Sequence, residues 1–137
     1  MKRFILSLGV GFLLNNVVST LIATTVLNPL LNPMFNGTVR TEEQGLVFPS
    51  LLGGYFLLTL FMVLGFPYFH LNRGWFVKGT VWGLLVGGAT FISGHLVVAG
   101  WSIIPWLPMM LSGVLDTLAP IATGIIIAYF YRNETGA

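Results

Sequence analysis

The chain has 137 residues, of which 55% are hydrophobic and only 7% are charged, and its formal net charge is +2. Soluble domains carry about 25% charged residues, so this composition, with a mean hydropathy of +0.89, excludes that class. The six basic residues lie near the ends of apolar segments instead of forming a stripe, which excludes a nucleic-acid-binding surface. The sequence contains no cysteine, which excludes disulfides and thiolate metal sites.

Four apolar segments are long enough to cross a bilayer, which takes about 20 residues in a helix. We expect a single all-α transmembrane domain over residues 1–137, folded as a left-handed antiparallel four-helix bundle. The predicted spans cover residues 4–27, 45–69, 79–104 and 109–131.

The first segment is apolar in its first half and partly polar in its second. It follows two basic residues, and its length favours a membrane helix over a cleaved signal peptide. Asn16, Thr20 and Thr24 recur every four residues and therefore share one helix face. A polar face in lipid is expected to turn inward, either as interhelical hydrogen-bonding groups or as part of a site.

Prolines mark the predicted ends of the first two helices. Asn-Pro pairs at residues 28–29 and 32–33 predict that the first helix ends near residue 27. Pro49 lies in the first turns of the second segment, where proline is tolerated, and Pro67 closes that segment. The connection between these two helices is expected to be a solvated loop, because it carries the acidic stretch with Arg40, Glu42 and Glu43.

A short basic connection with His70, Arg73 and Lys78 is predicted before the third segment, beside interfacial aromatic residues. The third segment then carries glycines at a spacing of four, a pattern that lets a neighbouring helix backbone approach closely. Continuing by fours leads to His95, so we expect His95 to face protein. The sequence leaves open whether the glycines face the bundle or a partner. The predicted helix-packing glycines are Gly79, Gly83, Gly87, Gly113 and Gly124.

The fourth segment combines an acidic residue with a proline. Gly113, Asp116 and Pro120 fall on one helix face. Pro120 has no N–H to donate to the carbonyl oxygen four residues earlier, which belongs to Asp116. Asp116 is therefore predicted to offer a carboxylate and a freed backbone carbonyl at the same depth.

The distribution of basic residues predicts the orientation. They mark the N-terminus, the middle connection and the C-terminus, and the other two connections carry no such excess. By the positive-inside rule, both termini are expected on the cytoplasmic side of a cytoplasmic-type membrane, and an even number of spans agrees with this because it places both termini on one side.

Depth brings several polar residues into one layer. With a rise of about 1.5 Å per residue, Asp116 lies roughly 11 Å and His95 roughly 14 Å from the outer ends of their helices. Ionisable groups in a span are by default a functional hypothesis, although an Asp–His pair that only fixes helix packing remains an alternative. We predict a buried polar cluster at this depth, made of Asp116, His95, Asn16, Thr20, Tyr55 and Thr59.

Metal and cofactor sites are not expected. Zinc needs more ligands than His95 and Asp116 provide. A haem between two histidines would need both at matched depth. His70 is predicted at the cytoplasmic end of its helix and His95 in the outer half of the membrane, so the two do not match. The run from Lys78 to Gly87, together with the carboxylate of the last helix, resembles small four-helix integral membrane proteins of bacteria. That resemblance implies a fold and no activity.

Two functions are compatible with these features, and no enzyme activity is expected. The first is an accessory subunit that packs on other membrane proteins, or on copies of itself, within the lipid bilayer. The second is binding or transport of a small solute, cation or proton through the cluster at Asp116 and His95. A lipid-modifying enzyme, with one Asp and one His as acid and base, is a more distant third.

Overall fold

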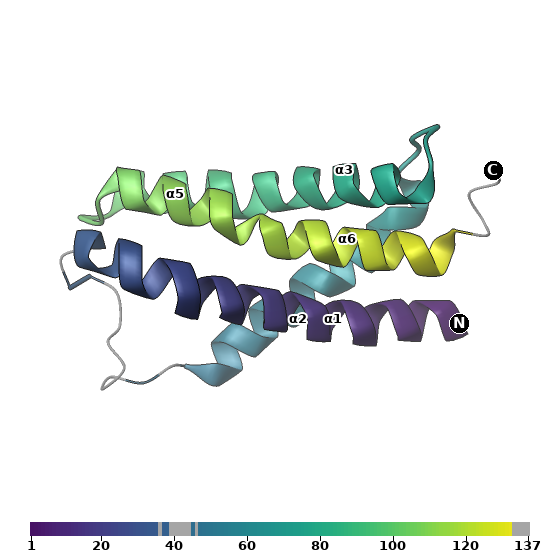
Figure 1. The fold of residues 1–137 in the computed structure, drawn as a ribbon, viewed down its shortest axis with the longest axis horizontal. Coiled ribbons are helices and arrows are strands. Elements are labelled where there is room, and N and C mark those ends of the chain that lie inside the picture. Colours follow the sequence, from purple (N-terminus) through teal and green to yellow (C-terminus); the bar gives the residue numbers. More distant parts are fainter. Residues whose placement is uncertain (36, 39–44, 46, 133–137) are drawn as a thin grey trace.

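The computed structural model describes residues 1–35, 37–38, 45 and 47–132. Regular structure in these residues is entirely helical, which confirms the all-α class. The start of the first helix and the end of the last lie at the same end of the molecule (Figure 1). Four helical stretches are long and apolar enough to cross a membrane: Lys2–Phe35, Phe48–Tyr68, Trp75–Trp101 and Trp106–Tyr131.

The first stretch is longer than predicted. Helix α1 (Lys2–Ile22) continues as the π-helical segment η1 (Ala23–Leu31) and the 3-10 turn η2 (Asn32–Phe35), so the expected end near residue 27 is wrong. The hydroxyls of Thr24 and Thr25 donate to the carbonyl oxygens of Thr20 and Leu21, which competes with the α-helical ladder. The wider turn accommodates Pro29 inside the helix. The acidic loop predicted after this stretch lies outside the described residues.

The second stretch takes an oblique course. It comprises α2 (Phe48–Gly65) and the 3-10 turn η3 (Phe66–Tyr68), with Pro49 in the first turn and Pro67 in the last. The other three stretches run side by side along the long axis of the molecule, whereas α2 crosses them diagonally (Figure 1). The arrangement therefore differs from a regular bundle in the direction of one helix.

The last two stretches are both interrupted. The third consists of α3 (Trp75–Gly87), the π-helical turn η4 (Gly88–Ile92) and α4 (Ser93–Trp101). It begins four residues earlier than predicted, which moves Lys78 from the expected loop into the first helical turn. The fourth stretch breaks at Thr117, between α5 (Trp106–Asp116) and α6 (Leu118–Tyr131).

The α3 glycines face α6. A Cβ atom at Gly79 would lie 2.6 Å from the carbonyl oxygen of Gly124, and one at Gly83 would lie 2.5 Å from Cα of Ile121. Both distances are shorter than real Cβ contacts, so a side chain at either position would push the backbones apart. The sequence left open whether this glycine stripe faces the bundle or a partner. The structure shows that it packs against α6 of the same chain.

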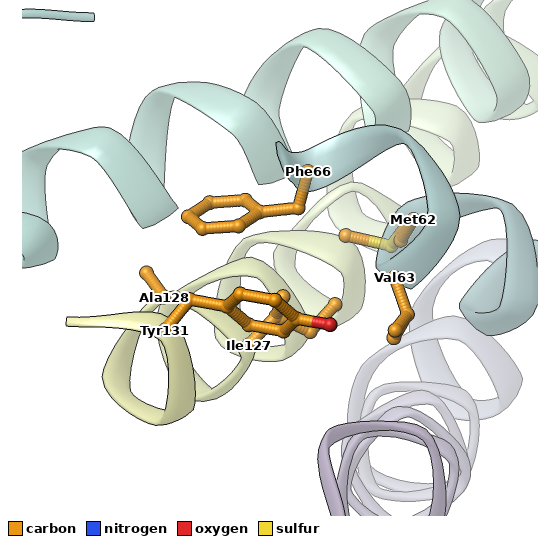
Figure 2. Close-up of a cluster of buried hydrophobic side chains, with 6 residues drawn as sticks. All are labelled: Met62, Val63, Phe66, Ile127, Ala128 and Tyr131. Carbon is orange, nitrogen blue, oxygen red and sulfur yellow. The ribbon is translucent and has the colours of Figure 1, made fainter. Parts of the chain in front are cut away.

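A cluster of buried side chains joins α2 to α6 at the end of the molecule where α2 finishes (Figure 2). Trp82 of α3 adds a cross-link there, since its Nε1 donates to the carbonyl oxygen of Met62 at 3.2 Å. The C-terminal end of α2 is therefore fixed against α6 and α3. Because α2 runs obliquely, its N-terminal half diverges from α6 (Figure 1). The cluster consists of Met62, Val63, Phe66, Ile127, Ala128 and Tyr131.

Candidate functional site

His95 and Asp116, one in each of the last two stretches, lie beside each other. His95 is on α4, Asp116 is the last residue of α5, and Nε2 of the first is 3.5 Å from Oδ2 of the second. The side chains are 23% and 17% exposed, respectively. Placing an aspartate in a membrane span costs about 2.5–3.5 kcal/mol, and a partner at this distance offsets part of that cost.

The ring orientation of His95 fixes which of its nitrogens carries a hydrogen. Its Nδ1 lies 2.6 Å from the carbonyl oxygen of Phe91. A carbonyl oxygen can only accept, so Nδ1 carries a hydrogen and donates it. One further proton can lie on Nε2, which gives imidazolium beside carboxylate, or on Asp116, which gives imidazole beside carboxylic acid. Either way the neutral pair holds one exchangeable proton.

Helix irregularities flank the pair. The π-helical turn η4 precedes α4, and the break at Thr117 follows Asp116. At Gly113 a Cβ atom would lie 2.9 Å from the Phe91 carbonyl oxygen and 3.0 Å from Cα of Ile92. The missing side chain at Gly113 therefore lets α5 approach η4, which places Asp116 within reach of His95.

The pair lies on the wall of an open pocket of about 610 Å³ between α2 and the η4–α5 region. Most of the lining is aliphatic or aromatic, and its few polar groups include the Tyr55 hydroxyl. Apolar walls with a few placed polar groups are typical of small-molecule sites. The lining residues are Ser50, Leu51, Gly54, Tyr55, Leu58, Phe61, Thr90, Phe91, His95 and Asp116.

Of the six residues predicted to form the cluster, Asp116, His95 and Tyr55 line this pocket. Thr59 is buried one turn farther along α2, and its hydroxyl donates to the Tyr55 carbonyl oxygen at 2.9 Å. The other two residues, Asn16 and Thr20, do not join them. Asn16 donates to the carbonyl oxygen of Phe12 in its own helix, and Thr20 is exposed.

The inward face predicted for α1 is wrong by one residue. Asn15 and Ser19 are buried, and neither amide atom of Asn15 has a hydrogen-bond partner among the described residues. The Ser19 hydroxyl likewise has no hydrogen-bond partner among the described residues. A sequence signal for this face exists, because Ser7, Gly11, Asn15 and Ser19 recur at intervals of four.

Other side chains do not extend the site toward a metal centre. Within the described ranges, no group of three or more His, Cys, Asp or Glu side chains is placed to hold a metal ion. Comparisons with protein-family models, with curated proteins and with solved structures give no match. The function is therefore argued from the geometry of these residues.

Proposed function

We propose that the chain is an integral protein of a cytoplasmic-type membrane that binds a small cation at Asp116 and His95 and moves it in exchange for a proton. The observation that supports this most is the one-proton pair on the wall of an open pocket. In the proposed orientation both termini are cytoplasmic, because the basic residues gather at that end. The pocket then lies in the outer half of the membrane.

In this proposal Asp116 binds the solute and His95 holds the proton. A cation that reaches the Asp116 carboxylate competes with the imidazolium for the same charge. Two positive charges beside one carboxylate repel each other strongly where water is scarce. The imidazolium therefore releases its Nε2 proton as the cation binds, and the charge of the site stays balanced. Tyr55 supplies a hydroxyl on the opposite wall.

The test uses protein reconstituted into liposomes that enclose a pH-sensitive dye. Guanidinium and tetramethylammonium, which keep their charge, serve as probes alongside sodium. We expect wild type to move protons against at least one probe gradient, whereas Asp116→Asn and His95→Gln match protein-free liposomes. Ser112→Ala is the control, because Ser112 is buried on α5 outside the pocket lining. Wild-type flux equal to that of protein-free liposomes, for protons and every probe, contradicts the proposal.

The accessory-subunit function remains a second proposal, and the course of α2 favours it. Because α2 leans away from α4 and α5, the pocket between them is open enough to accept side chains of a partner helix. The glycine stripe is occupied by α6 and offers no such surface. The test is the native mass after gentle extraction: a particle with other polypeptides supports this function, and one made of this chain alone contradicts it.

A further inference from the structure

Lys78 is buried although it lies at the basic end of the molecule. It stands in the first turn of α3 and is 7% exposed. The other basic residues that the structure describes, namely Lys2, Arg3, Arg73 and Arg132, are all exposed. Lysine is almost never buried to this degree unless its ammonium group is paired.

The described residues around Lys78 give that ammonium no counter-charge. Its Nζ lies 5.0 Å from the centre of the Phe66 ring, a cation–π contact. The structure gives the Lys78 ammonium group no hydrogen bond or ion pair within the described ranges. The one carboxylate side chain in those ranges, Asp116, lies beside His95, about 25 Å farther along the third stretch. An ammonium has three N–H donors, and a ring face satisfies at most part of this capacity.

Lys78 also lines a pocket of about 560 Å³ at this end of the molecule. His70 and Asn72, from the connection that precedes α3, contribute exposed polar side chains to its rim. The rings of Phe66 and Tyr131, whose centroids are 5.7 Å apart, form an apolar wall (Figure 2). The pocket thus combines a buried cation, neutral hydrogen-bonding groups and an apolar surface.

The charges of the described residues at this end favour an anion. The N-termini of α1 and α3 and the C-termini of α2 and α6 meet here, so the helix dipoles oppose one another and the formal charges decide the sign. Among the described residues, Lys2, Arg73 and Lys78 contribute positive formal charge at this end. Among the described residues, no acidic side chain lines the pocket.

We propose that this pocket binds a phosphate group, with the Lys78 ammonium as its ion-pair partner and His70 and Asn72 as hydrogen-bond donors at the rim. A phosphate oxyanion accepts several donors at once and forms short charge-assisted hydrogen bonds with an ammonium. The apolar wall of Phe66 and Tyr131 suits a phosphate that carries an organic chain. The source is either a phospholipid headgroup of the adjacent leaflet or a free phosphate, and both present the same oxyanion. This proposal is independent of the function assigned to Asp116 and His95.

The experiment measures lipid and phosphate binding to the full chain. In the lipid arm, native mass spectrometry compares retention of phosphatidylglycerol with that of diacylglycerol, which has the same acyl chains and no phosphate. In the phosphate arm, protein in phosphatidylcholine nanodiscs is titrated with inorganic phosphate against chloride at equal ionic strength, with thermal unfolding as the readout. Selective retention of phosphatidylglycerol identifies a lipid source, and stabilisation by phosphate identifies a free one. No selectivity in either arm overturns the proposal.

Variants assign the effect to this pocket. Lys78→Met keeps the aliphatic stem and removes the charge, so we expect binding to weaken on the order of tenfold or more. Lys78→Arg is expected to retain binding. Arg73→Gln, at an exposed position of the same connection and outside the pocket lining, is the matched control: it also removes one positive charge and should weaken binding far less than Lys78→Met. If Lys78→Met fails to fold, Asn72→Asp tests the same pocket, because it adds a carboxylate at the exposed rim and should abolish binding. Binding by Asn72→Asp or Lys78→Met equal to wild type overturns the proposal.

Discussion

The α3–α6 interface and the pocket between α2 and the η4–α5 region are built in opposite ways. At the interface, glycines let two helix backbones touch, so that a single added carbon at Gly83 would collide with Ile121. At the pocket, α2 stands off and leaves about 610 Å³ between side chains. In that region Gly54 has no atom within 4 Å of the place where its Cβ would be.

This difference separates the parts that hold the fold from the parts that remain accessible. Lipid tails are as apolar as the helix surfaces that face them, so the hydrophobic effect does not drive helices together in a bilayer. Helix association there relies on close packing instead. The glycine interface therefore fixes the third and fourth stretches against each other and sets the level of His95 and Asp116. Those two side chains then lie where packing is loose, so that a solute can reach them. Close packing and access are divided between two neighbouring regions of one small chain.

The largest expected effect on stability comes from adding one methyl group at the α3–α6 interface. In Gly83→Ala the new Cβ would lie 2.5 Å from Cα of Ile121, so two backbones must separate. Overpacking of this kind costs about 1–3 kcal/mol, and backbone contact places Gly83→Ala at the upper end. Reversible unfolding in detergent, followed by circular dichroism, measures this loss.

The matched control for that variant is Gly9→Ala on α1. Gly9 has nothing within 4 Å of its Cβ position, so this variant is expected to be as stable as wild type or gain up to about 1 kcal/mol in helix propensity. Equal stability of Gly83→Ala and Gly9→Ala would contradict the packing assigned to α3 and α6.

An intermediate effect is expected at Asn15, which is fully buried but unpaired among the described residues. Asn15→Leu removes an amide whose burial without hydrogen bonds costs about 1–3 kcal/mol, so the variant should be more stable than wild type by roughly 1–2 kcal/mol. Asn16→Leu is the control, since it removes a bond to the Phe12 carbonyl oxygen and should bring no such gain. The same unfolding assay decides, and a loss of stability in Asn15→Leu would show that its amide is paired.

The sequence predicted which segments form helices better than it predicted where those helices end and in which direction they run. Apolar length was sufficient to identify four helices, because each must cover about 20 residues to cross a membrane. The Asn-Pro pairs suggested a helix end that the structure does not have, since threonine hydroxyls and a wider turn accommodate Pro29. The oblique direction of α2 depends on its packing against two other helices, through Met62 and Phe66 against α6 and through Phe56 against Phe12 of α1, which no local pattern encodes.

For the candidate site, the sequence predicted correctly that His95 and Asp116 lie at matching depth along their helices. It did not predict correctly which face of α1 turns inward. Counting residues from the helix ends placed His95 and Asp116 in one layer, and their side chains lie 3.5 Å apart. On α1, two adjacent asparagines gave competing polar faces, and the choice of Asn16 was wrong. The small residues Ser7 and Gly11, four and eight positions before Asn15, mark the face that packs. Binding at this site stays a prediction.

The smallest expected change in stability comes from filling the pocket. Gly54→Leu adds four carbon atoms where Gly83→Ala adds one. Because the Cβ position of Gly54 is unobstructed, we expect its unfolding free energy to change by less than about 1 kcal/mol. The new side chain should nevertheless cover Asp116 and Tyr55, which line the same pocket.

Chemical access to the pocket provides the readout for Gly54→Leu. The chain has no cysteine, so Thr90→Cys introduces a single thiol on the pocket wall. A small maleimide should modify this thiol readily in the Thr90→Cys protein and severalfold more slowly when Gly54→Leu is added. Gly53→Leu, on the neighbouring exposed position outside the lining, is the matched control and should leave the rate unchanged. If Gly54→Leu instead destabilised the protein as much as Gly83→Ala, α2 would pack against α4 and α5 as closely as α3 packs against α6, and the division between a closed and an open region would fail.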